Sequence, residues 1–210
     1  MTAEPSHDCP LCPRLVAFRK VNRDAEPDWF NGPVQSFGPP QAELLIVGLA
    51  PGLRGANRTG RPFTGDYAGD LLYATLKEFG FARGQYEARP GDSLRLVNAR
   101  ITNAVRCVPP QNKPTPAEIN TCRRFLIGAI EQTKHTRAIV ALGKIAHDSV
   151  VRALNGKLAH YKFVHGAKHE IADYTLFDSY HCSRYNTNTG VLTPKMFRAV
   201  FAAVRQHLGN

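Results

Sequence analysis

Residues 44–79 of the chain read LLIVGLAPGLRGANRTGRPFTGDYAGDLLYATLKEF. The stretch opens with a continuous apolar run at 44–49, which is typical of a short strand buried on both faces. It closes at 67–79 with Leu72 and Leu76 at helical spacing on an apolar face. A buried strand, a glycine-rich polar loop and an amphipathic helix, in this order, predict one unit of an α/β protein.

The same alternation continues along the chain. Further strands are predicted at 96–105, 138–142 and 174–180, where apolar residues gather in short runs. Thr115 and Thr193 each precede a proline and are predicted to open a helix, the first of them with the capping box TPAE. Strands that alternate with helices favour a mainly parallel sheet covered on both faces, with ligands at the carboxyl ends of its strands.

Composition and charge fit one globular domain with an anionic partner. The chain has 210 residues, 43% of them hydrophobic, which predicts a sizeable core and a single domain over 1–210. Residues 1–40 are rich in proline and charge and are interpreted as an extended N-terminal arm. Lysine and arginine number 27 against 17 aspartate and glutamate, so the formal net charge is +10. This excess favours nucleic acid as the partner, and a basic enzyme without such a partner is the alternative.

Nothing in the sequence predicts export or membrane insertion. No apolar stretch reaches the ~18–20 residues that span a bilayer. The opening MTAEPSHDCPLCPRL lacks the charged and apolar regions of a secretory signal. We therefore expect a monomeric, cytoplasmic protein that has no membrane partner and associates with the nucleoid.

Four of the five cysteines are spaced like a set of metal ligands. Cys9 and Cys12 form a C-x2-C pair, and Cys107 and Cys122 form a wider pair. In a reducing compartment such thiols bind metal more often than they form disulfides. The spacing fits a structural zinc, the commoner use of such pairs, or a 4Fe–4S cluster, and four ordinary buried cysteines are the third alternative. Cys182 has no close partner and is interpreted as a small buried residue.

The glycine-rich loop at 48–66 carries Phe63 and Asp66 among three arginines. It lacks the phosphate-binding pattern GxxxxGK[ST], and its glycines do not form GxGxxG. A phenylalanine beside a carboxylate suits a pocket in which a flat base stacks and an acid takes part in the chemistry. The alternative is a structural loop whose Phe63 plugs into the core.

Two later segments place polar side chains after strands. Asn103 has an amide that can donate to and accept from a base edge, although a loop asparagine more often caps a turn. His181 can donate a hydrogen bond to a leaving oxyanion, although a lone histidine is more often a satisfied polar residue. His160, His165 and His169 lack a zinc motif, so their segment is interpreted as a basic hairpin or loop.

Three motifs and the opening cysteines resemble one family. GLAPGLRGANRTGRPFTGD is similar to the first motif of the family 5 (type b) uracil-DNA glycosylases, TNAVRCVPPQNKP to the middle motif, and DSYHCSRYNTNTGVLT to the last, HPSxxNTNTGRLT. CPLCPRLVAFR resembles the cluster-binding start shared by families 4 and 5. The resemblance runs from Cys9 to Thr193. It implies a three-layer α/β/α sandwich with a central four-stranded mainly parallel sheet, and a 4Fe–4S cluster on the four paired cysteines.

The resemblance also implies roles at the matching positions. Phe63 would stack on a flipped base, and Asn103 would hydrogen-bond its edge. His181 would stabilise the oxyanion that forms on the base, Asp66 would position water or stabilise the sugar cation, and Asn186 would help to hold the site or the water. Further base contacts are expected from Ala50 and Gly52, and DNA contacts from Arg58, Arg61, Arg184, Tyr185 and Asn188.

Three positions depart from the motifs. Leu49 stands where family 4 enzymes carry a glutamate, a departure typical of family 5 that leaves Asp66 as the carboxylate. Cys182 replaces the usual proline of HPS, so we expect a different turn after His181. Val191 replaces the usual arginine of TGRLT, so strand insertion or the range of bases is expected to differ.

The sequence thus predicts a monofunctional glycosylase that hydrolyses the N-glycosidic bond of uracil in DNA, as in base excision repair. No lysine demands a covalent, strand-cutting mechanism. One alternative is a non-catalytic Fe–S protein that binds damaged DNA. Another is a glycosylase whose preferred base is hypoxanthine, xanthine or another deaminated base. The partner is expected to be double-stranded DNA, with single-stranded DNA as an alternative.

Overall fold

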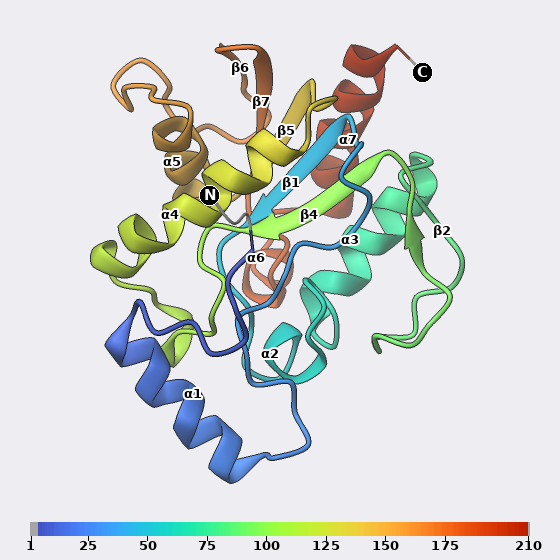
Figure 1. Cartoon of the computed structure of the whole chain (residues 1–210). Helices are drawn as coiled ribbons and strands as arrows, with labels where there is room; N and C mark the ends of the chain where they lie inside the picture. The colour runs from blue at the N-terminus through green and yellow to red at the C-terminus, as the bar shows by residue number, and fades with distance from the viewer. Residues whose placement is uncertain (1–3, 210) are drawn as a thin grey trace.

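The computed structural model describes residues 4–209 and builds them around one five-stranded sheet of order β4-β1-β5-β7-β6 (Figure 1). The first four of these strands run parallel, and β6 lies antiparallel to β7 at one edge. The strands are β1 (Leu44–Gly48), β4 (Ala99–Asn103), β5 (Ala138–Leu142), β6 (Lys168–Ile171) and β7 (Tyr174–Ser179).

The sheet has five strands rather than the predicted four. All four predicted strands are present, and β6 is the addition, since the chain turns back at Ala172 to form a hairpin with β7. The predicted strand at 96–105 is also divided. Asn98 has a φ of 52°, a left-handed conformation that interrupts an extended chain, so a short β3 (Arg95–Leu96) precedes β4.

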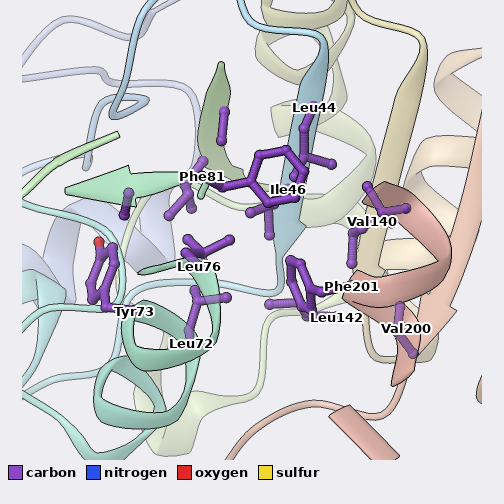
Figure 2. Packing of buried hydrophobic residues seen from close by; sticks show 14 of the residues in the cluster. Leu44, Ile46, Leu72, Tyr73, Leu76, Phe81, Val140, Leu142, Val200 and Phe201 are labelled. Carbon is purple, nitrogen blue, oxygen red and sulfur yellow. The ribbon is translucent and has the colours of Figure 1, made fainter. Parts of the chain in front are cut away.

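Helices cover both faces of the sheet, which confirms the three-layer α/β/α arrangement (Figure 1). Leu44 and Ile46 of β1 belong to the apolar cluster on one face, where side chains of α3 and α7 pack (Figure 2). Leu45 and Val47 point into the cluster on the other face, with α4 and α5. The covering helices are α3 (Tyr67–Glu78), α7 (Pro194–Leu208), α4 (Pro116–Gln132) and α5 (Lys144–Ala153).

Two helices begin where the sequence predicts. The Thr115 side chain accepts from the Glu118 backbone amide, while the Glu118 carboxylate accepts from the Thr115 amide, so the capping box is complete. Thr193 caps α7 by accepting from the backbone amide of Met196. Each cap satisfies backbone donors that the first helical turn leaves without a partner.

The prediction of an extended arm at 1–40 was wrong in its middle. Residues Pro13–Ala25 form helix α1, with Pro13 in the first turn, where the missing amide hydrogen has no consequence. The buried face of α1 contains Leu15, Arg19 and Asn22. Because two of these three residues are polar, the apolar period that would indicate a helix is weak in the sequence. Residues 1–3 lie outside the described residues.

Smaller elements complete the chain. The strand β2 (Ala82–Arg83) pairs with β3 in a ribbon separate from the main sheet. Two short helices, α2 (Ala56–Thr59) and α6 (Arg184–Asn188), and the 3₁₀ turn η1 (Pro110–Asn112) lie in loops that follow strands. Within residues 4–209, no helix is both long and apolar enough to span a membrane.

A buried polar network joins α5 to the β6–β7 hairpin. His147 Nδ1 lies 2.7 Å from Asp178 Oδ1, and His147 Nε2 lies 2.9 Å from the carbonyl oxygen of Tyr161. His169 Nε2 lies 3.1 Å from the other Asp178 oxygen. The Tyr161 carbonyl only accepts, so Nε2 carries hydrogen, and the carboxylate beside Nδ1 favours the protonated ring over the neutral one. Burial acts to lower the pKa of His147, but its hydrogen bonds outweigh burial and raise the pKa.

Candidate active site

A pocket of about 700 Å³ opens at the carboxyl ends of the parallel strands. Its walls come from the loop after β1, from Asn103 at the end of β4, from Asn112 of η1 and from residues 181–184 after β7. Open α/β sheets bind their ligands at this edge. The pocket therefore brings together segments that lie far apart in the sequence, including all three motif regions.

Phe63 belongs both to the core and to the pocket wall. Its side chain packs in the apolar cluster under α3 and also lines the pocket. The ring lies near the ring of His181, with centroids 5.9 Å apart and planes 27° apart. A Cβ atom on Gly48 would lie 2.7 Å from Phe63 Cζ and 2.4 Å from Asn103 Oδ1. Glycine at position 48 is therefore what lets both side chains approach the end of β1.

Asn103 and Asp66 each have a side-chain oxygen without a hydrogen-bond partner among the described residues. Asn103 is 3% exposed, and its Oδ1 accepts no hydrogen bond. Asp66 Oδ1 is likewise buried without a partner. Burial raises the pKa of Asp66, and the nearby amides of Ala68 and Gly69 at the start of α3 oppose this only in part. Asp66 also packs closely on the loop, because a Cβ atom on Gly55 would lie 2.2 Å from Asp66 Oδ2.

His181 lines the pocket with a neutral ring. Its Nδ1 is buried and has no hydrogen-bond partner in the part of the chain that the structure describes. Burial lowers the pKa of His181 to about 4, so the ring carries no charge at neutral pH. Asn186 does not line the pocket; its Nδ2 donates to the carbonyl oxygen of His181 over 2.8 Å. Asn186 is therefore brought to the site as a support for His181, not as a group that faces the cavity.

The remaining predicted base contacts also lie in the pocket. Ala50 and Gly52 both line it, directly after the end of β1. Neither residue has a side chain longer than a methyl group, so the wall here consists largely of backbone. A flat ligand can approach such a wall closely.

Four of the five predicted DNA contacts are exposed near the pocket mouth. Arg184 lines the pocket and lies 5.5 Å from the centroid of the Tyr67 ring. Tyr185 is 73% exposed on α6. Arg58 and Asn188 are exposed as well, on α2 and α6. These groups are available to a ligand larger than the pocket.

The prediction that Arg61 contacts DNA was wrong. Arg61 is 6% exposed, and its guanidinium makes two hydrogen bonds of 2.7 Å to the carboxylate of Asp92. In sequence, an arginine in a glycine-rich loop resembles a phosphate ligand. Its buried partner Asp92 lies 31 residues further along the chain, so the local sequence does not reveal the ion pair. Arg61 supports the loop from inside the protein.

The pocket lining includes residues that the sequence interpretation did not assign to the site. Among them are Arg54, Tyr67 and Asn112. Asn112 follows Gln111, and both have a φ of 56°. The dipeptide Gln-Asn between prolines was a usable signal, because asparagine tolerates the left-handed conformation and marks sharp turns. Tyr67 is the first residue of α3, directly after Asp66, and nothing in the sequence pattern indicates that its side chain faces the pocket.

The four paired cysteines lie together. Cys9, Cys12, Cys107 and Cys122 surround one small apolar cavity with Leu15, and all are free thiols. Burial raises the pKa of Cys107 to about 12 and that of Cys122 to about 11. The sulfur of Cys122 accepts from the backbone amide of Arg106 over 3.3 Å. Cys182 is fully buried away from this group, as predicted.

Comparisons with known proteins agree with this geometry. Residues 35–205 match the protein family described as the uracil DNA glycosylase superfamily. A type-5 uracil-DNA glycosylase of Thermus thermophilus is 44% identical over 208 residues, which cover 96% of this chain and 94% of that protein. A type-5 uracil-DNA glycosylase of Mycobacterium leprae is 43% identical over 211 residues, which cover 96% and 92%. One from Pyrobaculum aerophilum is 37% identical over 190 residues, which cover 89% and 83%. The chain therefore belongs to the uracil DNA glycosylase superfamily, in the branch of its type-5 relatives.

Proposed function

We propose that this protein is a monofunctional uracil-DNA glycosylase, which hydrolyses the bond between the base and its sugar in base excision repair. One observation carries the proposal. Asp66 Oδ1, Asn103 Oδ1 and His181 Nδ1 are buried polar atoms that find no partner within residues 4–209, and all three residues line one pocket. Buried polar atoms are nearly always paired in folded proteins, so three unpaired ones around a cavity indicate a ligand that pairs them.

The unpaired atoms match the polar edge of a uracil ring stacked beside Phe63. The Asn103 oxygen accepts from the ring N–H, and the His181 ring faces a carbonyl oxygen of the base. A nucleotide reaches such a pocket only when it leaves the duplex, which costs a few kcal/mol and least for a mispaired base. Uracil opposite guanine is therefore the preferred substrate within this proposal.

The chemistry follows from two opposite electrostatic demands. As the glycosidic bond breaks, negative charge builds on the base and positive charge on the sugar. The neutral His181 ring donates a hydrogen bond to the developing oxyanion, and one such donor is worth about 10²–10³ in rate. The Asp66 carboxylate stabilises the sugar cation and orients the attacking water. Among residues 4–209, no lysine lines the pocket, which fits hydrolysis without a covalent lysine intermediate.

Exposed groups at the pocket mouth suit a DNA backbone. Arg58 and Arg184 supply positive charge, and Asn188 supplies a polar side chain. Tyr185, at 73% exposure, is an aromatic side chain free to contact the duplex where the flipped base leaves a gap. We take double-stranded DNA as the substrate form, since flipping and gap filling both require a duplex.

The four paired cysteines suit a 4Fe–4S cluster better than a single zinc. Within residues 4–209, no three of their sulfur atoms lie within 4.8 Å of one another. A tetrahedral zinc with Zn–S bonds of about 2.3 Å would hold four sulfurs closer than this. Cys9, Cys12, Cys107 and Cys122 would hold the cluster, and when bound it would cross-link α1 to the segments after β4. The Arg106 amide donates a hydrogen bond to the Cys122 sulfur, and such hydrogen bonds to sulfur are found around iron–sulfur clusters.

An excision assay tests the proposal directly. Purified protein is incubated with duplexes that carry uracil opposite guanine or adenine, hypoxanthine or xanthine, with and without hot alkali. We expect abasic sites from the uracil duplexes and strand breaks only after alkali. Binding without excision would instead identify a damaged-DNA-binding protein. Iron and sulfide content with absorbance near ~400 nm tests the cluster, and a colourless protein with one zinc would refute it.

A further inference from the structure

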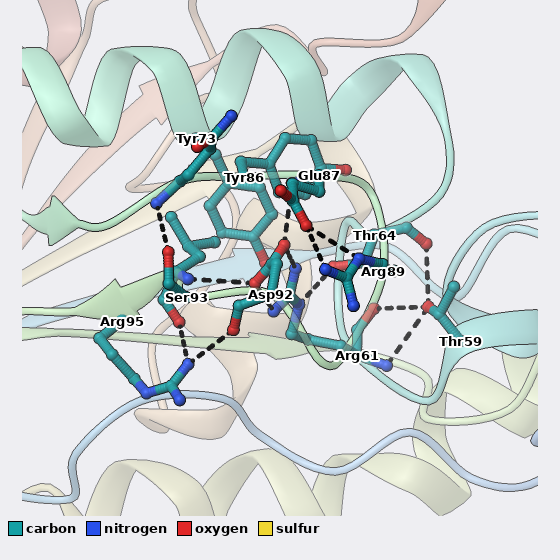
Figure 3. A network of polar contacts seen from close by, with 12 residues as sticks. Thr59, Arg61, Thr64, Tyr73, Tyr86, Glu87, Arg89, Asp92, Ser93 and Arg95 are labelled. Atoms are coloured by element: carbon teal, nitrogen blue, oxygen red, sulfur yellow. Dashed lines mark hydrogen bonds and ion pairs between the residues drawn. The ribbon is translucent and has the colours of Figure 1, made fainter.

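The ribbon outside the main sheet reaches the loop that carries Phe63. Residues 84–94 connect β2 to β3, and they supply the side chains of Tyr86 and Asp92 (Figure 3). Tyr86 contacts the backbone at Phe63, and Asp92 binds Arg61. This peripheral hairpin therefore touches the pocket wall at the residue that faces the base.

The first part of this contact is a buried ion pair. Arg61 donates to both oxygens of Asp92 and, through Nε, to the hydroxyl of Thr64 over 2.8 Å. Its guanidinium carbon lies 5.8 Å from the ring centroids of both Tyr73 and Tyr86. Hydrogen bonds from Arg61 hold the pKa of Asp92 low, at about 2. Two-point pairing and aromatic packing fix the direction of the guanidinium.

The second part consists of two tyrosine hydroxyls that hold the backbone on either side of Phe63. The Tyr73 hydroxyl donates to the carbonyl oxygen of Pro62 over 2.6 Å. The Tyr86 hydroxyl donates to the carbonyl oxygen of Phe63 over 3.2 Å and accepts from the Gly65 amide over 3.3 Å. Burial raises the pKa of Tyr86 to about 12, so its hydroxyl keeps the proton that it donates.

Phe63 needs this support because its backbone is strained. Its φ is 51°, in the left-handed region that bulky residues rarely adopt. Such a conformation persists only where the surroundings over-determine it, and strained residues of this kind cluster at functional sites. A return to ordinary φ would turn the ring away from its present position beside His181.

We infer that Tyr86 and the Arg61–Asp92 pair are positioning residues that fix Phe63 as the stacking surface for the base. The inference rests on the proposed function, because it assigns their effect to the excision step. None of these three side chains is among those that line the pocket. Without these side chains the base should be held less firmly, so excision should be slower, while the affinity for DNA should stay nearly unchanged.

The test uses Tyr86→Phe in the full-length protein, because this change removes one oxygen and keeps the ring. We expect the single-turnover excision rate at saturating enzyme to fall about 3- to 30-fold, the range that loss of such hydrogen bonds allows. The Kd for a duplex with a non-cleavable uracil analogue should stay within about twofold of the wild type. Tyr174→Phe, distant from the pocket, is the matched control and should keep the wild-type rate.

A double-mutant cycle separates positioning from general loosening. If Tyr86 acts through Phe63, then Tyr86→Phe should have little further effect in a Phe63→Ala background. A full, multiplicative loss in that background, or a wild-type rate for Tyr86→Phe alone, would overturn the inference. Hydrogen exchange of the Gly65 amide gives a readout without activity. Faster exchange in Tyr86→Phe supports the inference even where no variant excises uracil, an outcome that would overturn only the proposed function.

Discussion

Two histidines of this protein have opposite surroundings: His147 is fully buried, whereas His181 is half-buried in the pocket wall. Both nitrogens of His147 are hydrogen-bonded, one to Asp178 and one to Tyr161, and these bonds raise the pKa of the ring despite its burial. His181 lines the pocket, has an unpartnered Nδ1 and is neutral because burial lowers its pKa to about 4. The first arrangement stabilises the fold, and the second leaves a ring nitrogen available to a ligand. Incomplete pairing of its buried polar atoms therefore distinguishes the site from the fully paired network around His147.

The largest expected effect comes from breaking the complete network. His147→Ala leaves the buried carboxylate of Asp178 without its closest partner, and such losses cost about 3–5 kcal/mol of unfolding free energy. For a chain of this size each kcal/mol lowers Tm by about 2–4 °C, so we expect a fall of about 6–20 °C in thermal denaturation.

The paired variant His147→Gln/Asp178→Asn is the control for this loss. It removes both charges together, so it should recover most of the lost stability if an unpaired charge is the cause. A fall in Tm of less than about 2 °C in His147→Ala would contradict the role given to the network.

The corresponding substitution in the pocket, at His181, should lower the excision rate and leave the unfolding free energy nearly unchanged. His181→Ala removes the oxyanion donor, and we expect the single-turnover excision rate to fall about 10²–10³-fold. Tm should change little, because the ring makes no side-chain hydrogen bond through its buried Nδ1. Wild-type excision in His181→Ala would remove this residue from the proposed chemistry, whatever its effect on folding.

The two histidines should also give opposite pH dependences of stability. The pKa of His147 is raised in the folded state, so its contribution is complete below about 6.5 and is lost as pH rises through the raised value. The pKa of His181 is lowered, so the unfolded chain gains protons first and stability falls as pH drops from about 6.5 to about 4.

Denaturation with urea from pH 4.5 to 9 measures both slopes. Relative to the wild type, His181→Asn should flatten the acid side of the profile. His147→Gln/Asp178→Asn should flatten the alkaline side, with the two effects independent of each other. Identical profiles for all three proteins would show that neither histidine has the protonation state assigned to it.

The same contrast explains how much of the molecule the sequence predicts. The four parallel strands and the capped helices follow from local patterns, because apolar runs and Thr-Pro pairs carry that information themselves. The helix α1 was missed because Arg19 and Asn22 occupy its buried face. The edge strand β6 was missed as well, since it is short and only Ile171 is fully buried.

The site was predicted less evenly. Asp66 and His181 lie in segments that follow predicted strands, and Asn103 lies near the end of one, so the topology brings all three to one edge of the sheet. Arg61 is buried because it pairs with Asp92, a partner distant in sequence that no local pattern reveals. Pairing between distant segments decides whether an arginine faces solvent or the interior, and this is also why the network of His147 and Asp178 was not foreseen.

The smallest effect is expected for exposed side chains that belong neither to the His147 network nor to the unpaired polar atoms of the pocket. Arg184 is exposed, and its one described side-chain partner is the Tyr67 ring. Arg184→Ala should weaken DNA binding up to about tenfold and reduce the slope of log K against log salt by about 1, since one phosphate contact is lost. The excision rate at saturating enzyme should stay near that of the wild type, because the reacting groups are untouched. Arg198→Ala is the matched control, because Arg198 is an exposed arginine that pairs with Glu78 and does not line the pocket. An equal change of salt slope in both variants would mean that net charge, and not the position of Arg184 at the pocket mouth, governs the contact with DNA.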